Sequence, residues 1–180
     1  MAVAFVGPWC AGKSTWGRAY ADFIGSEFVD LDELAPVYGE ELGWSVEHLL
    51  ARNEAVGMVA SEAEWEPVRV HVVERALEEH PQAVVAFGAS YTNYTDDELE
   101  ARAETLLDAH ATVLVTPTMD NDEAALICWE RAVSARGERW ARERVDFSSW
   151  EPTALDWRVA DAVLLTAGGL IVESATGAAS

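Results

Sequence analysis

Short apolar runs alternate along the chain with longer segments in which apolar residues recur at helical spacing. This alternation is typical of an α/β fold whose strands are joined by helices. Five runs read as strands, over residues 2–6, 27–30, 82–88, 111–116 and 161–166. Several of them are almost continuously apolar, as expected for parallel strands that are covered on both faces. The pattern therefore predicts a parallel, five-stranded sheet.

Helices are predicted over residues 14–24, 62–79, 97–109, 122–136 and 152–159. Residues 36–60 carry one proline and three glycines among short helical pieces, which favours a flexible region. After the last strand, a Gly168–Gly169 turn is expected to lead into a short helix and a frayed tail. There is no internal repeat or linker, so residues 1–180 are interpreted as a single domain with an acceptor-side subdomain at about 33–80.

Between the first strand and the first helix lies Gly7-Pro8-Trp9-Cys10-Ala11-Gly12-Lys13-Ser14-Thr15, which fits G-x-x-x-x-G-K-[ST] at every constrained position. In this strand–turn–helix context, backbone N–H groups and the positive end of the helix bind a phosphate. A chance match to a glycine-containing turn is the less favoured interpretation. The residues predicted to bind the nucleotide here are Gly7, Ala11, Gly12, Lys13, Ser14 and Thr15.

Two side chains of this loop carry specific expectations. Lys13 would place a positive charge at the terminal phosphates, and Ser14 would hold Mg²⁺. Lys13 is also the only lysine in the chain, because all other positive side chains are arginines. Its retention suits a phosphate-binding role, although arginine-rich usage also follows from genomic base composition.

The second strand ends in Asp30-Leu31-Asp32-Glu33, and carboxylates at a strand's carboxyl end lie at the ligand-binding edge of an open α/β sheet. Asp30 is a candidate to hold magnesium through water. Asp32 is a candidate general base for a substrate hydroxyl. The alternative is that these acidic residues only cap and charge the next helix.

The formal net charge of −20 argues against nucleic acid or an anionic membrane as a partner. Against this background, five arginines gather in one short segment, namely Arg131, Arg136, Arg139, Arg142 and Arg144. We interpret residues 131–150 as an Arg-rich lid that closes over the phosphates. The alternative is a solvated helix face with alternating charge pairs.

Two cysteines, Cys10 and Cys128, are too few and too scattered for a disulfide framework or a zinc site. The sequence has no signal peptide and no apolar run long enough to span a bilayer. We therefore expect a cytoplasmic protein that is a monomer or a weak homodimer.

Taken together, these motifs resemble the shikimate kinase family within the nucleoside monophosphate kinase-like P-loop proteins. The resemblance runs along nearly the whole chain. It includes the phosphate loop, Gly17-Arg18 after it, Phe28-Val29-Asp30-Leu31-Asp32 as the F-x-D-x-D signature, the strand at Val84 to Gly88, and Arg158-Val159-Ala160-Asp161.

The resemblance implies a three-layer α/β/α fold of the P-loop kinase type with strand order 2-3-1-4-5. ATP and Mg²⁺ would be the cofactors. Asp30 would orient magnesium, and Asp32 would hold the acceptor hydroxyl. Arg136 would lie near the adenine. One of the arginines 139, 142 and 144 would act from the lid, and we take Arg139 as the catalytic candidate.

The departures from the family pattern fall on the acceptor side. The family's F-R-x-x-E reads here Trp65-Glu66-Pro67-Val68-Arg69, so arginine and glutamate have traded places. The family's triple glycine becomes Gly88-Ala89-Ser90, and a second substrate arginine is missing before Ala154. Without these arginines, bidentate binding of the shikimate carboxylate is lost. The candidate substrate residues are Asp32, Trp65, Glu66, Arg69, Gly88 and Ala89.

These observations predict an ATP-dependent kinase that phosphorylates a hydroxyl of a non-shikimate small molecule, such as a specialised metabolite or an antibiotic. Glu66 favours a neutral or cationic acceptor. Several aromatic residues are candidates to line a larger pocket or to pack in the core, namely Trp9, Trp44, Trp65, Tyr91 and Tyr94. The alternatives are shikimate kinase proper, a nucleotide-binding regulatory NTPase without an acceptor, and a nucleotide kinase.

Overall fold

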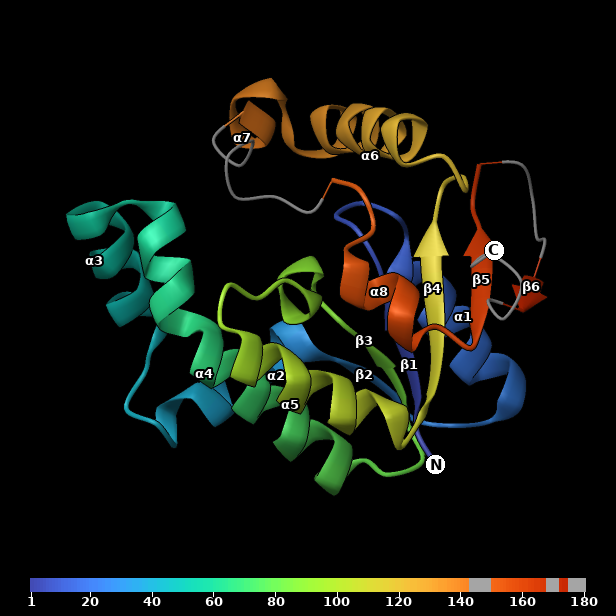
Figure 1. Cartoon of the computed structure of the whole chain (residues 1–180), viewed down its shortest axis with the longest axis horizontal. Coiled ribbons are helices and arrows are strands. Elements are labelled where there is room, and N and C mark those ends of the chain that lie inside the picture. Colours follow the sequence, from blue (N-terminus) through green and yellow to red (C-terminus); the bar gives the residue numbers. More distant parts are fainter. Residues whose placement is uncertain (143–149, 168–171, 175–180) are drawn as a thin grey trace.

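The structure, a computed structural model, describes residues 1–142, 150–167 and 172–174. A single sheet organises this part of the chain, with strand order β2-β3-β1-β4-β5-β6 (Figure 1). The strands are β1 (Val3–Val6), β2 (Phe28–Asp30), β3 (Val84–Ala86), β4 (Ala111–Thr116), β5 (Ala162–Leu165) and β6 (Val172–Ser174). The first five strands are parallel and follow the predicted order 2-3-1-4-5.

The predicted C-terminal helix is wrong where the structure describes that segment. Val172–Ser174 forms β6 instead, which pairs antiparallel with β5 in the register Ala162↔Ser174. In the five-stranded prediction β5 is an edge strand, and its outward N–H and C=O groups offer hydrogen bonds to any extended segment that reaches them. The returning chain takes up these bonds. The predicted Gly168–Gly169 turn and the tail at 177–180 lie outside the described residues.

Helices cover both faces of the sheet, which confirms the three-layer architecture. On one face, Val6, Val85 and Leu114 point into a core shared with α4 (Met58–Glu79), α5 (Asp97–Asp108) and α8 (Ala154–Val159). On the other face, Phe5, Val84 and Val115 pack with residues of α1 (Lys13–Ile24) and α6 (Asn121–Arg136). Neighbouring strand residues therefore face opposite layers, as the twofold repeat of a strand requires.

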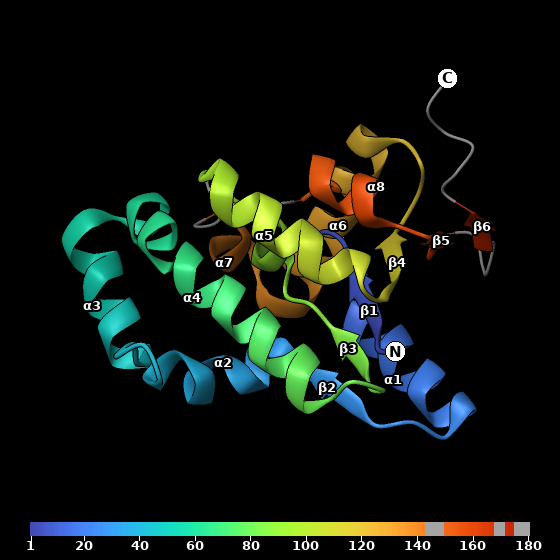
Figure 2. The same ribbon diagram turned by 60° about the horizontal axis from the view of Figure 1, so that its bottom comes forward.

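The region predicted as short helical pieces forms α2 (Leu31–Glu40) and α3 (Val46–Val56). The following helix, α4, begins at Met58, four residues before the predicted start at Glu62. No residue of α3 is buried, and both views show α3 with the start of α4 extending away from the sheet (Figures 1 and 2). These helices span the range, about 33–80, for which an acceptor-side subdomain was predicted.

A 3₁₀ helix, η1 (Ala89–Thr92), follows β3, and a short helix, α7 (Glu138–Arg142), follows α6. None of the helices in the described ranges has the length and apolar character that crossing a membrane would require. The carboxyl ends of β1, β2 and β3 lie at one edge of the sheet because these strands are parallel neighbours. Each of them leads directly into a segment of the candidate site.

Candidate active site

The phosphate loop connects β1 to α1 through a backbone that only particular residues can adopt. Gly7 has φ of 130°, and a Cβ there would lie 2.3 Å from the carbonyl oxygen of Val115. Glycine is therefore required at this position by both conformation and space. Cys10 has φ of 59°, which is uncommon for a side chain other than glycine. A loop of this shape can direct its backbone N–H groups toward an anion.

The Lys13 ammonium is buried at the start of this loop. Its Nζ donates hydrogen bonds to the carbonyl oxygens of Gly7 and Pro8, at 2.8 Å and 2.7 Å. Burial lowers the pKa of Lys13, and the nearby carboxylates of Asp156 and Asp32 partly offset this effect. Burial disfavours the charged form of Lys13. A phosphate dianion beside its Nζ would favour the charged form, because the two opposite charges would pair.

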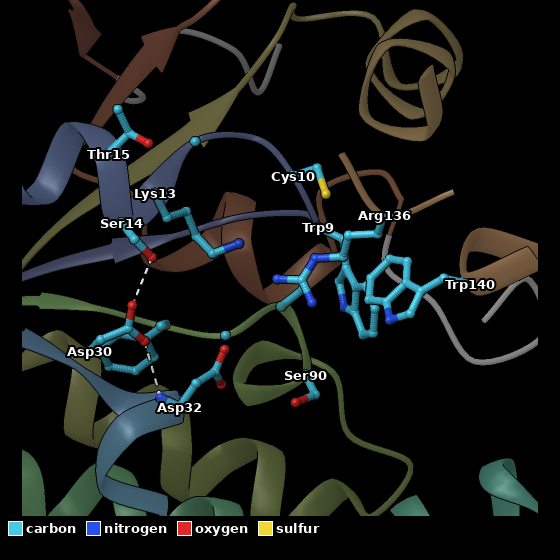
Figure 3. A pocket seen from close by; sticks show the side chains of 14 residues that line it. Trp9, Cys10, Lys13, Ser14, Thr15, Asp30, Asp32, Ser90, Arg136 and Trp140 are labelled. Atoms are coloured by element: carbon cyan, nitrogen blue, oxygen red, sulfur yellow. Dashed lines mark hydrogen bonds between the residues drawn. The ribbon is translucent and has the colours of Figure 1, made fainter. Parts of the chain in front are cut away.

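Ser14 and Asp30 lie together as the magnesium prediction requires. The Ser14 hydroxyl donates to Asp30 Oδ2 at 2.8 Å (Figure 3). The other oxygen, Oδ1, accepts from the Asp32 N–H at 3.1 Å and caps α2, so the helix-cap alternative also holds for Asp30. Among the described residues, no group of three or more His, Cys, Asp or Glu side chains is placed to hold a metal. A hydroxyl and one carboxylate nevertheless suit Mg²⁺, which takes oxygen ligands and keeps several waters alongside substrate phosphates.

Asp32 faces the pocket from the first turn of α2. Its side chain is exposed to solvent through the pocket, although protein groups surround the carboxylate on several sides. This burial raises the pKa of Asp32, the charge of Asp30 raises it further, and Lys13 and Arg136 lower it. A Cβ on Gly88 would come within 2.4 Å of Asp32 Oδ1. Gly88 therefore leaves the space that the carboxylate occupies.

One cavity of about 460 Å³ joins these groups. Its lining includes Lys13, Ser14, Asp30 and Asp32 on one side and Gly88, Ala89 and Ser90 on another. Trp9, Arg136 and Trp140 close a third side (Figure 3). A volume of this size is ordinary for a small-molecule site. The structure thus brings part of the predicted phosphate loop and three of the predicted acceptor residues, Asp32, Gly88 and Ala89, into one pocket.

Solved structures similar to this chain include shikimate kinases. The shikimate kinase from Acinetobacter baumannii in complex with shikimate aligns with 93% of this chain and 84% of its own, at 17% identity and a TM-score of 0.57. Shikimate kinase from Bacteroides thetaiotaomicron aligns with 92% of this chain and 86% of its own, at 15% identity and a TM-score of 0.52. No protein-family model matches the sequence, and comparison with curated proteins gave no match.

The chain has a shikimate kinase-like P-loop kinase fold. The resemblance inferred from the sequence is therefore confirmed at the level of the fold.

Within this shikimate kinase-like fold, three predicted acceptor residues lie away from the pocket. Trp65, Glu66 and Arg69 are buried on α4, and none of them is among the described residues that line the cavity. Trp65 packs against Trp44 at a centroid distance of 5.1 Å. These three assignments are corrected here, because the side chains are engaged in interior contacts.

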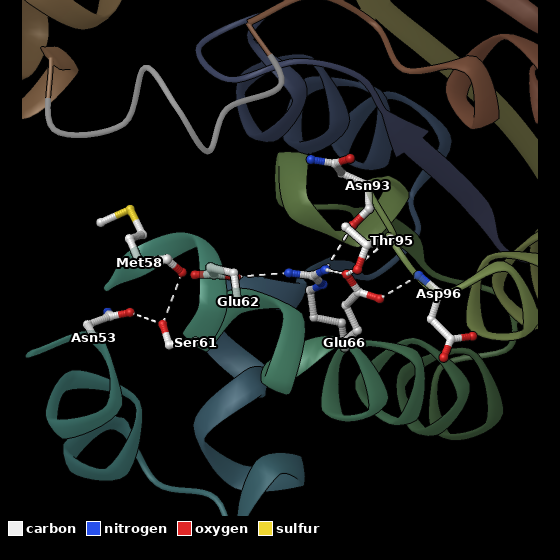
Figure 4. Close-up of polar contacts among 9 residues, drawn as sticks. Asn53, Met58, Ser61, Glu62, Glu66, Asn93, Thr95 and Asp96 are labelled. Carbon is white, nitrogen blue, oxygen red and sulfur yellow. Dashed lines mark hydrogen bonds and ion pairs between the residues drawn. The ribbon is translucent and has the colours of Figure 1, made fainter. Parts of the chain in front are cut away.

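The exchanged pair, Glu66 and Arg69, fastens α4 to the loop that precedes α5 (Figure 4). Glu66 accepts hydrogen bonds from the N–H and hydroxyl of Thr95, at 2.8 Å and 2.7 Å, and from the Asp96 N–H at 3.1 Å. Arg69 donates to the Asn93 carbonyl at 2.8 Å and to Glu62 at 2.9 Å. The exchange of arginine and glutamate thus creates an internal clamp.

The arginines of the predicted lid have different environments. Arg136 lines the pocket, and its guanidinium lies 4.8 Å from the Trp140 ring. Arg131 donates to Ala11 O at 3.2 Å and to Thr166 Oγ1 at 3.0 Å, so it ties α6 to the phosphate loop and the end of β5. Arg142 bonds Glu138 at 2.9 Å, as the charge-pair alternative expects. Arg139 is exposed on α7, and Arg144 lies outside the described residues.

Arg136 lines the same cavity as Asp32, and its charge lowers the pKa of that carboxyl. The adenine position suggested for Arg136 stays a prediction. The sequence reasoning also missed Trp140, which lines the pocket beside Trp9. Of the five aromatic candidates, Trp9 lines the cavity, whereas Trp65, Tyr91 and Tyr94 are buried and Trp44 packs against the core.

Proposed function

We propose that this protein is an ATP-dependent small-molecule kinase that transfers the γ-phosphoryl group of Mg–ATP to a hydroxyl of its acceptor. One observation carries the proposal: the Asp32 carboxylate and the Lys13 ammonium face a single cavity (Figure 3). A carboxylate able to take a proton thus lies beside a site for the terminal phosphates. That pairing is what phosphoryl transfer to an alcohol requires.

Each residue has a defined part in the transfer. Asp32 accepts the proton of the acceptor hydroxyl as the oxygen lone pair attacks the γ-phosphorus. The bond from that phosphorus to the β,γ-bridging oxygen breaks, and ADP leaves with the electron pair. Lys13 and Arg136 stabilise the negative charge on the oxygens of the phosphoryl group during its transfer. Arg139 remains a second candidate for this last role.

Ser14 and Asp30 would hold the metal ion, and Gly7, Ala11, Gly12 and Thr15 would form the phosphate cradle. When bound, Mg²⁺ neutralises charge on the β- and γ-phosphates. Gly88 and Ala89 would border the acceptor beside Asp32. The raised pKa of Asp32 suits this chemistry, because a base whose pKa lies closer to neutral accepts a proton more readily.

Shikimate remains a weaker candidate acceptor, because Arg69, the displaced arginine, bonds Asn93 and Glu62 instead of facing the cavity. A regulatory NTPase without an acceptor is the competing function. Such an NTPase needs the phosphate loop but gives Asp32 no role, whereas the missing side chain at Gly88 leaves room for this carboxylate, which lines the pocket.

ATP turnover with and without a panel of hydroxyl compounds, including shikimate, tests the proposal. We expect at least one non-shikimate alcohol to accelerate ADP release and to appear as its phosphomonoester by mass spectrometry. The Lys13→Ala variant measures the background, with an expected loss of about 10²–10³-fold. Hydrolysis that no compound accelerates would favour the NTPase.

A further inference from the structure

Two tryptophans from distant parts of the chain form one wall of the pocket. Trp9 belongs to the phosphate loop and Trp140 to α7, and their ring centroids lie 5.1 Å apart. We call this pair the indole wall. Trp150 supports Trp9 at 5.8 Å, and Trp129 packs against Trp150 at 5.4 Å. Backing by further indoles fixes the orientation of the wall.

The wall stands at the end of the pocket where transfer would occur. Lys13 Nζ marks the position of the β- and γ-phosphates, and it bonds the carbonyls of Gly7 and Pro8, directly before Trp9 in the chain. Asp32 and Ser90 lie across the pocket from Trp9 and Trp140 (Figure 3). An acceptor whose hydroxyl meets Asp32 would therefore touch the indole wall with its remaining surface.

The charges near the wall restrict the acceptor further. The Arg136 guanidinium already lies over the Trp140 ring at 4.8 Å, so a cationic acceptor there would meet a like charge. An anionic acceptor would compete with the γ-phosphate for Arg136. Arg69, the cation that could have held a carboxylate, bonds Asn93 and Glu62 inside the protein.

We propose that the acceptor is an uncharged alcohol with a planar aromatic ring, which packs on the indole wall while its hydroxyl reaches Asp32. This inference rests on the proposed kinase function and names its substrate class. Aromatic rings prefer offset or edge-to-face contact with one another, and such pairs gain binding energy beyond buried area. A saturated ring of equal size forgoes that gain.

Saturation-transfer NMR with the full chain, Mg²⁺ and a non-hydrolysable ATP analogue tests the proposal. The probes are 4-hydroxybenzyl alcohol, cyclohexylmethanol, choline and shikimate. We expect the aromatic alcohol to bind about fivefold or more tightly than each of the other three, in line with the energy of an aromatic pair. Equal or tighter binding of choline, shikimate or cyclohexylmethanol would overturn the proposal.

Matched variants locate the effect. Trp9→Ala and Trp140→Ala should each weaken 4-hydroxybenzyl alcohol binding about five- to tenfold, whereas Trp9→Phe should retain most of it. Trp44→Ala is the control, because Trp44 stacks on His48 at 4.4 Å and is not among the described lining residues. Unchanged probe affinity in both alanine variants would refute the indole wall as the acceptor site.

Calorimetry of the ATP analogue separates this inference from the proposed function. If the analogue binds and no aromatic alcohol does, the acceptor class is wrong and the kinase function stands. If the analogue itself does not bind, the proposed function fails. Should Trp9→Ala also lose analogue binding through damage to the phosphate loop, Trp140→Ala decides the question alone.

Discussion

The proposed phosphate end of the pocket comes from one continuous stretch, residues 7–15, whereas the proposed acceptor end is assembled from separate segments. Asp32 comes from α2, Gly88 and Ala89 follow β3, and Trp140 comes from α7. At the phosphate end, backbone conformation sets the chemistry, because loop N–H groups and one lysine can serve any nucleoside triphosphate. At the acceptor end, packing between elements decides which side chains reach the cavity. An acceptor site can therefore change while the phosphate loop stays the same.

Removing the candidate base, Asp32, should give the largest effect, and this effect should fall on phosphoryl transfer and not on nucleotide binding. Asp32→Asn keeps the shape of the side chain but cannot accept a proton, so transfer should fall by about 10²–10⁴-fold. Nucleotide affinity, measured by calorimetry, should stay unchanged because Asp32 lies on the acceptor side. If transfer persists at the original rate, Asp32 is not the base and is only a residue in the first turn of α2.

Breaking the clamp between α4 and the loop before α5 tests whether Arg69 belongs to the interior or to the acceptor. Arg69→Met leaves the buried Glu66 without its cation and should cost about 3–5 kcal/mol in unfolding free energy. Arg52→Met is the matched control. It breaks the exposed pair with Glu64 and should leave the free energy of unfolding nearly unchanged.

Urea titrations of the two variants measure this difference. If Arg69→Met is as stable as Arg52→Met but no longer binds the acceptor, Arg69 faces the substrate and our correction is wrong.

Filling the space beside Asp32 should lower the transfer rate by a moderate factor. In Gly88→Ala the new methyl would lie 2.4 Å from Asp32 Oδ1 and must displace the carboxylate. The backbone itself tolerates alanine, because Gly88 has φ of −61°. A displacement of about 1 Å can cost about 100-fold in rate, so we expect a 10- to 100-fold loss of transfer at about the original nucleotide affinity. Full activity would show that Asp32 need not occupy its observed position.

The smallest predicted effect is on the pH dependence of the transfer rate. Asp32 acts as a base only when ionised, and its pKa is raised above the ordinary 3.8 by burial and by Asp30. The rate of transfer should therefore fall as the pH drops through this raised pKa and should be constant above it. Arg136→Gln should move the midpoint upward, because Arg136 lowers the pKa of Asp32. If Arg136→Gln does not shift the midpoint of the pH profile, the group that titrates is not Asp32.

The sequence predicted the strand, loop and helix around residues 7–15 because the information for these elements is local. The spacing from Gly7 to Ser14 and the caps at Asp96 and Asp120 specify elements through neighbouring residues alone. The same holds for strands β1 to β5, whose apolar runs give their burial directly.

Several contacts around the proposed acceptor end could not be predicted, because the partners are distant in sequence. Trp140 reaches Trp9 across more than one hundred residues, and Glu66 finds its partners at Thr95 and Asp96. Helical spacing placed Glu66 and Arg69 on one helix but could not tell which neighbour each would meet. The pairing of β6 with β5 was missed for a different reason, because these strands are close in sequence but residues 172–174 were expected to be helical.

Lys13 offers the most direct test of the central claim, that this loop binds the terminal phosphates of a nucleotide. Because Lys13 is the only lysine, protein labelled with ¹³C at lysine Cε gives one lysine signal, which reports the titration of this group. Without nucleotide, we predict a pKa below the ordinary 10.5, because the ammonium is buried. With Mg²⁺ and a non-hydrolysable ATP analogue, the pKa should rise, because the phosphates favour the charged form. An unchanged midpoint at saturating analogue would contradict the account.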